Sequence, residues 1–427
     1  MKNWRCFTLA VAVATGMSAG AQTLDDCRRW AQEHYPEIRQ YDLIAQSEQY
    51  NLSNAARSWI PQLTLSGQAS YQSATPTYPR VLADMLAARG VDMAGLRKDQ
   101  YKIALDIYQN IWDGGQNRAR REEIKAGAEE QRRAAEVDLY ALEERIDDLY
   151  FGILLLDGQI EQAEAKLTLL RRNFDKIQSY CRNGAAMQAD ADAVEAEMLT
   201  AKQMLEQATL SRLCFRQMLE LFIGRPLNDT RLPVPEVQGL RSRESARPEL
   251  SLFDAQLHRL TAQEKSLHST VMPRFSAFAQ GYYGYPGLDM FQSMLSEEWS
   301  LNLVAGVRLS WNIGAFYTRK NDLQLIRTRR SQVEVNREIF LFNTRLGSSR
   351  EEGEIERLRR AVADDDRIVE LRRRVRMAAE SQLENGVIDV TALLQKITDE
   401  TTASLARRTH ETELLQSLCR LKHMYNQ

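Results

Sequence analysis

Residues 299–313 read WSLNLVAGVRLSWNI, and apolar residues alternate with mostly polar or small ones along the whole stretch. Successive side chains of a β-strand point to opposite faces, so this pattern predicts a sheet with one apolar and one polar face. Residues 62–71, 101–111 and 274–283 are predicted strands as well. Strands of this kind fit a transmembrane β-barrel, and they equally fit a soluble sheet with one wet face.

Long stretches free of proline separate the strand pairs. Residues 116–180 and 318–384 are rich in charged and helix-forming residues, and each is followed by Asn-Gly and then by a further helical stretch. A helix of the first length would run close to 100 Å at about 1.5 Å per residue. Such a length is typical of a coiled coil or helical barrel. Shorter helices are predicted before each first strand, from Leu24 to Ser58 and up to Val271.

The two halves of the chain match each other in the order of their landmarks. Pro36 and Pro61 are 25 residues apart, as are Pro248 and Pro273. The Asn-Gly pairs and the strand exits match at a separation of 202 residues: Asn183-Gly184 with Asn385-Gly386, and Asn110-Ile111 with Asn312-Ile313. We therefore predict a duplicated helix–strand–strand–helix unit, with repeats at 22–223 and 244–427 and a linker at 224–243.

The N-terminus has the pattern of a secretory signal peptide. Lys2 and Arg5 precede an apolar stretch, and Ala19-Gly20-Ala21 resembles a cleavage site, so residues 1–21 are predicted to be removed. No later stretch is apolar enough for a transmembrane helix, so a membrane form would have to be a closed barrel. Four strands cannot close one, because such barrels begin at eight strands. A channel would therefore require several chains.

Aromatic residues stand at the ends of the predicted strands, as in the interfacial girdles of membrane barrels. They are Tyr71, Tyr101, Tyr283, Trp299 and Trp311. Together with the order and spacing of the W-I-P-Q-L and M-P-R-F corners, the W-D-G-G strand exit and the two N-G turns, this sequence resembles the TolC outer-membrane efflux protein family. The resemblance covers essentially the whole mature chain.

The resemblance implies a mainly α-helical fold with a transmembrane β part. Three chains would form a 12-stranded β-barrel continued by a long coiled-coil helical barrel in the periplasm. It implies a passive exit duct of a tripartite efflux or type I secretion system in the outer membrane, contacting outer-membrane lipid. A periplasmic adaptor and an inner-membrane pump would be the partners, and no cofactor is implied. The open alternative is a periplasmic coiled-coil adaptor or scaffold without a barrel.

The family places its closed constriction near the helical turns, which here are Asn183-Gly184 and Asn385-Gly386. An Asp six residues after the turn glycine is typical. Asp190 matches that position and Asp192 follows, whereas the second half has Ala392 there, with Asp389 as the nearest acid. These three acids are candidate gate residues. Equally, they are carboxylates that complement the positive ends of helices.

Charged residues on the polar faces of the predicted strands are candidates to line the lumen. They are Lys102, Asp106, Arg274 and Arg308. The alternative is an ordinary wet sheet face. Cys27, Cys214 and Cys419 lie at similar distances from the predicted turns and corners, so we also consider that they cluster and form a disulfide.

Composition and motifs favour neither an enzyme nor a nucleic-acid-binding protein. The net charge is −2, and the five histidines form no H-E-x-x-H pattern. No G-x-S-x-G motif or P-loop is present, and no metal-binding cysteine spacing occurs. We therefore expect no catalytic residues, no bound metal and no nucleic-acid partner.

Overall fold

The computed structural model describes residues 22–90, 95–228, 231–237, 239 and 242–426. The predicted signal peptide, residues 1–21, lies outside the described residues. The chain divides into two compact units, and the division passes through two long helices. One unit holds 39–137 and 248–341, and the other holds the rest. Each predicted repeat therefore contributes to both units; the repeat and linker boundaries themselves remain a proposal.

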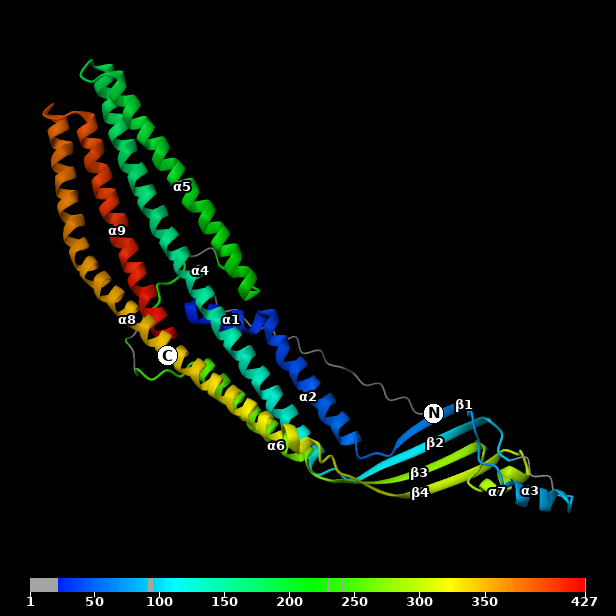
Figure 1. Ribbon diagram of the computed structural model, residues 1–427. Helices are drawn as coiled ribbons and strands as arrows, with labels where there is room; N and C mark the ends of the chain where they lie inside the picture. The colour runs from blue at the N-terminus through cyan, green and yellow to red at the C-terminus, as the bar shows by residue number, and fades with distance from the viewer. Residues whose placement is uncertain (1–21, 91–94, 229–230, 238, 240–241, 427) are drawn as a thin grey trace, which may run out of the picture. The chain divides into compact units, whose positions relative to one another are not determined.

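The first unit contains a single antiparallel sheet in the order β1-β2-β3-β4 (Figure 1). Its strands are β1 (Gln62–Tyr71), β2 (Asp99–Trp112), β3 (Arg274–Tyr285) and β4 (Ser300–Ser310). The sequence predicts both ends of β1 correctly. It places the end of β4 at Ile313, which is wrong, because β3 begins at Arg274 opposite Ser310 and leaves nothing beyond to pair with.

In the register of the four strands, the predicted apolar residues of neighbouring strands lie on one face of the sheet. Leu65 lies opposite Leu105, and Gly281 opposite Leu303, on the apolar face. This face is open in the chain, since Leu65 and Leu303 keep 73% and 71% of their surface exposed. Soluble proteins rarely leave so continuous an apolar surface uncovered.

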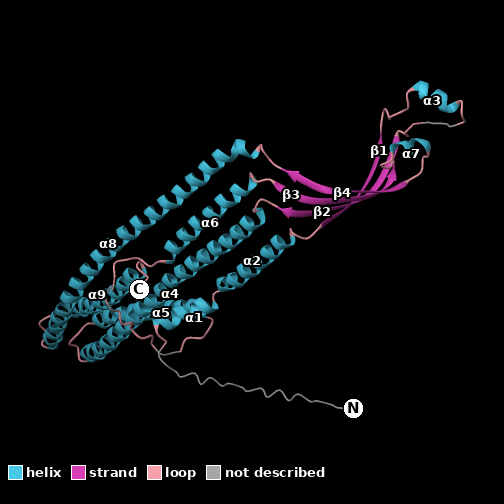
Figure 2. Cartoon of the chain, turned by 90° about the horizontal axis from the view of Figure 1, so that it is seen from below, coloured by secondary structure: helices cyan, strands magenta, loops and turns pink. Residues whose placement is uncertain are grey.

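Two short helices occupy the loops that join the strands. They are α3 (Arg80–Ala87), between β1 and β2, and α7 (Met290–Leu295), between β3 and β4. Figure 2 shows both at the same end of the sheet. The connection between β1 and β2 therefore contains a helix of its own. Pro79 stands at the N-cap of α3, directly before its first helical residue.

The sheet unit also contains the helices that lead into it. The expected single helix from Leu24 to Ser58 is wrong. It is divided into α1 (Leu24–His34), a 3-10 turn at Pro36–Ile38, and α2 (Arg39–Arg57), of which only α2 belongs to this unit. Tyr35 has an extended ψ of 132°, because a residue before proline disfavours the helical conformation. The counterpart of α2 in the second half, α6 (Pro248–Thr270), begins directly at its proline.

The long helices confirm the length predicted from the sequence. α4 (Gln116–Arg182) has 67 residues and α8 (Ala315–Glu384) has 70. Each is followed by a tight turn and a second helix, α5 (Gln188–Ile223) and α9 (Val390–His423) (Figure 1). Gly184 and Gly386 have φ of 73° and 69°, a conformation that favours glycine and reverses the chain between the paired helices.

Two large apolar clusters, besides a smaller one around Leu421, hold the second unit together. We call them the turn cluster and the middle cluster. The turn cluster joins all four long helices near their turns, through buried residues that include Leu170, Val194, Ala379 and Ile397. The middle cluster includes Cys27, Ile146, Tyr150, Leu219 and Cys419. It also takes in Leu227 and Leu232 from the segment after α5, which therefore packs on the core.

Among the described residues, no helix combines the length and the apolar character that crossing a membrane requires. The predicted fold class, mainly α-helical with duplicated long helices and a four-stranded β part, is confirmed.

Candidate functional site

Three places in the chain carry the polar side chains of interest: the polar face of the sheet, the helical turns, and a network around α1. Each is built within one unit. Among the described residues, the structure has no group of three or more His, Cys, Asp or Glu side chains arranged to bind a metal ion.

The polar face of the sheet brings together the four charged residues singled out from the strands. Asp106 lies opposite Thr64 on β1 and Gln280 on β3, and Lys102 lies opposite Gln68 and Gly284. Arg308 pairs with Ser276, two residues after Arg274 on the same strand. Because directly paired residues point to the same side of a sheet, all four side chains share one face.

Neighbouring strands fix the positions of these side chains. The Gln280 amide donates a hydrogen bond to Asp106 at 2.6 Å, and Ser66 donates a longer one at 3.5 Å. The Arg308 guanidinium lies 4.9 Å from the centre of the Phe278 ring. The Lys102 ammonium lies 5.9 Å from that of Tyr282. The sequence alone did not show that both cations rest on aromatic rings of β3.

The three candidate gate acids all lie at helix N-termini beside the turns. Asp389 is the N-cap of α9 and accepts a hydrogen bond from the Ala392 backbone N–H at 2.7 Å. Asp190 accepts one from the backbone N–H of Met187 at 2.9 Å. Asp192 accepts one from the Gln188 side chain at 2.8 Å. The backbone bonds give Asp190 and Asp389 a local capping role, whereas the bond of Asp192 is to a side chain one turn earlier on α5; Asp192 and Asp389 are exposed.

An ion pair that the sequence analysis missed joins the two helical hairpins. Lys176, near the end of α4, contacts Glu384, the last residue of α8, at 2.5 Å. The hydrogen bond that the Lys176 ammonium donates to this carboxylate raises the pKa of Lys176. Both side chains are about half exposed, so the pair contributes little to stability. It nevertheless connects one hairpin to the other just below their turns.

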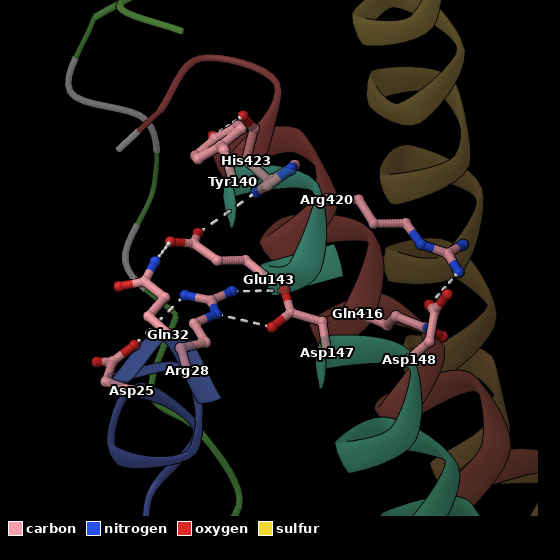
Figure 3. A network of polar contacts seen from close by, with 10 residues as sticks. All are labelled: Asp25, Arg28, Gln32, Tyr140, Glu143, Asp147, Asp148, Gln416, Arg420 and His423. Carbon is pink, nitrogen blue, oxygen red and sulfur yellow. Dashed lines mark hydrogen bonds and ion pairs between the residues drawn. The ribbon is translucent and has the colours of Figure 1, made fainter. Parts of the chain in front are cut away.

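A polar network anchors α1 on α4 (Figure 3). Arg28 donates two hydrogen bonds to Asp147, at 2.7 and 2.5 Å, and this carboxylate residue is only 3% exposed. Bidentate pairs of this kind are among the stronger polar interactions in proteins. Asp147 falls on the apolar stripe of α4 that includes Tyr150 and Leu154, a signal that could have marked it as buried and paired.

The same network reaches the C-terminal helix. His423 stacks on Tyr140 with ring centres 4.0 Å apart, and its Nδ1 lies 3.7 Å from Glu143. On the other side of α4, Asp148 accepts hydrogen bonds from Gln416 and Arg420 of α9 at 3.0 and 2.8 Å (Figure 3). These contacts connect α4 to both α1 and α9.

The cysteines do not cluster as considered from the sequence. Cys27 and Cys419 lie in the middle cluster, whereas Cys214 is exposed on α5. All four described cysteines are free thiols. The expectation of a three-cysteine cluster is wrong, because Cys214 falls on the side of α5 that faces away from this core. Burial raises the pKa of Cys27 to about 12 and that of Cys419 to about 11.

Comparison with protein families gives one match, covering α1 to the end of α5: residues 28–225 match the model of the outer membrane efflux protein family. This segment belongs to the outer membrane efflux protein family. The resemblance predicted from the sequence is thereby confirmed. The efflux-protein segment includes β1, β2 and the first helical hairpin. No curated protein matches the sequence.

Solved structures extend the likeness to nearly the whole chain. The outer membrane protein VceC from Vibrio cholerae has a TM-score of 0.69 at 13% identity, over 94% of this chain and 95% of that one. The Neisseria gonorrhoeae MtrE outer membrane channel gives 0.67 at 16%, over 94% and 88%. The Campylobacter jejuni CmeC outer membrane channel gives 0.67 at 13%, over 95% and 86%. At these identities, the likeness establishes the fold.

Proposed function

We propose that this protein is an outer-membrane channel, the exit duct of a tripartite efflux system. The observation that carries the proposal is the sheet. One face is apolar and open along all four strands, with Leu301 81% exposed, while the opposite face is polar. A sheet of this kind is stable in a lipid bilayer with its apolar face outward, where burial in hydrocarbon replaces exposure to water. The family match of residues 28–225 supports the same reading.

The unpaired edges of the sheet also require pairing with further copies of the chain. Within the chain, β1 and β4 are edge strands, each paired on one side only. Unpaired backbone groups are costly in lipid, so β1 of one copy must pair with β4 of the next until the ring closes. Three copies give 12 strands, which lies within the range of membrane barrels. The protein would therefore be a homotrimer in the outer membrane.

The helical hairpins would continue the channel into the periplasm. The turns at Gly184 and Gly386 would face a periplasmic adaptor and an inner-membrane pump, which supplies the energy for export. The channel itself would be a passive conduit for small molecules or proteins rather than an enzyme. The alternative of an adaptor without a barrel is disfavoured, because a soluble adaptor would gain nothing from four strands with an open apolar face.

The gate of the channel would lie near the two turns. Asp190, Asp192 and Asp389 would present rings of carboxylates there, as charged rings do in cation-conducting pores. Lys176 and Glu384 would hold the two hairpins of each chain together in the closed state. This role needs little stabilisation, since the pair has to bias only a local movement of the helix ends.

The channel proposal is tested by the behaviour of the protein in membranes. We expect it in the outer-membrane fraction, soluble only with detergent, as a particle of three chains whose gel mobility changes on heating. Recovery as a soluble periplasmic monomer would refute the proposal and favour the adaptor.

The gate proposal is tested by charge reversal. Lys176→Glu alone should raise conductance and the entry of large antibiotics, because it places two carboxylates in contact. The double exchange Lys176→Glu/Glu384→Lys should restore the closed state. Equal leakage from the single and double variants would contradict this role of the pair.

A further inference from the structure

The polar face of the sheet carries charge of predominantly one sign. Within the four strands it presents three cations, Lys102, Arg274 and Arg308, and one carboxylate, Asp106. β1 contributes only uncharged residues to this face. The surface therefore has a positive balance, although the chain as a whole has a net charge of −2.

Two of the cations are held in place by aromatic rings. Arg308 stacks on Phe278, and Lys102 lies over Tyr282. A Cβ at Gly306 would meet the Phe278 ring at 3.1 Å, so this ring lies across the glycine and forms a flat base for the guanidinium. A guanidinium in this position keeps N–H donors at its edge, where they can bind carboxylate or sulfonate groups.

The cations and the carboxylate do not neutralise each other. In the described part of the chain, no carboxylate forms an ion pair with Lys102 or Arg308. Asp106 is instead bonded by the uncharged donors Gln280 and Ser66. Those bonds fix its orientation toward β1 and β3, while Arg308 lies on β4. The two cations therefore remain available to a passing solute.

We propose that this face is a selectivity surface for anionic organic solutes, with Lys102 and Arg308 as the residues that select them. The inference rests on the proposed function, which places the face in the lumen in three copies. There the cations would attract anions, and Phe278 and Tyr282 would add contacts for planar apolar groups. At low ionic strength, a unit charge about 10 Å away changes the local concentration of a monovalent ion by about twofold.

The test is the reversal potential of the purified trimer in planar bilayers. Gradients of potassium chloride and of potassium benzenesulfonate each give a permeability ratio of anion over potassium. We expect Lys102→Gln/Arg308→Gln to lower this ratio about threefold or more, because six cations are lost per trimer. The exchange Lys102→Arg/Arg308→Lys should keep the ratio, and Asp106→Asn should raise it.

The outcomes separate the inference from the function on which it rests. Channels of Lys102→Gln/Arg308→Gln that conduct with an unchanged ratio would overturn the selectivity surface and leave the channel standing. The selectivity surface would also be overturned if Lys102→Arg/Arg308→Lys lowered the permeability ratio as much as Lys102→Gln/Arg308→Gln does. Positive charge would then not be the cause of the selectivity. Absence of conductance in the unaltered protein and in all variants, Lys176→Glu included, would overturn the channel itself.

Discussion

Two adjacent residues of β1 offer the sharpest test of how the sheet is placed. Leu65 lies on the apolar face and is 73% exposed in the chain, while exposed Thr64 lies on the polar face opposite Asp106. In a soluble sheet, arginine would be tolerated at both exposed positions within about 0.5 kcal/mol. In a membrane barrel, Leu65→Arg places a charge in hydrocarbon, whereas Thr64→Arg places it in the lumen beside a carboxylate.

The expected cost follows from the depth of the residue in the strand. Leu65 is the fourth of the ten residues of β1, close to the middle of the crossing. An arginine facing lipid at that depth costs about 2–4 kcal/mol, and a trimer contains three of them. The cost is therefore about 6–12 kcal/mol per trimer, enough to abolish assembly of a marginally stable complex.

The assay is the amount of heat-modifiable trimer in the outer-membrane fraction, with total expression as the reference. Leu65→Arg should remove the trimer, and Thr64→Arg should leave it close to the level of the unaltered protein. Equal trimer from both variants would refute the placement of the apolar face in lipid.

Three further predictions concern the helical part. Arg28→Ala leaves the buried Asp147 carboxylate without its partner and should lower the free energy of unfolding, measured by thermal unfolding, by about 3–5 kcal/mol. The control Asp25→Ala, at a side chain that is 90% exposed, should lower it by less than about 0.5 kcal/mol. Equal effects would contradict the anchoring role of the network. Gly184→Ala should destabilise by about 1 kcal/mol because φ is 73°, while Gly127→Ala, in an open position on α4, should stabilise by up to about 1 kcal/mol. Iodoacetamide at pH 8 should modify the exposed Cys214 much faster than the buried Cys27 and Cys419, whose raised pKa values keep them protonated. The contribution of these two protonated thiols to the stability of the fold is complete below their ordinary pKa of about 9 and is lost as the pH rises to 11–12. Rapid labelling of all three would contradict the described core.

The regular elements could be predicted from the sequence because local signals determine them. Alternation locates the strands, and Pro61 and Pro273 mark the corners before two of them. The Asn-Gly pairs mark the turns because a left-handed conformation is required there. Each of these signals acts within a few residues, so a single sequence is sufficient to read it.

The features that were missed depend on contacts between distant segments. The end of β4 depends on where β3 begins, which the pattern of β4 cannot reveal. The pairing of Arg28 with Asp147 joins residues 119 positions apart. The position of Cys214 depends on which side of α5 meets the core. The break at Pro36, by contrast, was readable from the residue before proline.

The candidate site was predicted as a set of residues and not as a set of contacts. Alternation placed Lys102, Asp106 and Arg308 on one face, because side-chain direction has a period of two residues. The rings beneath the cations come from β3, so their positions depend on the register between strands. Register is a tertiary property, and the sequence of one strand does not specify it.

The central claim is that copies of this chain assemble into a membrane channel, and electrical recording tests it most directly. Purified protein added to one side of a planar lipid bilayer is expected to produce discrete, equal steps of current as single trimers insert. A bilayer that stays silent with folded protein recovered from the outer membrane, both unaltered and with Lys176→Glu, would contradict the account.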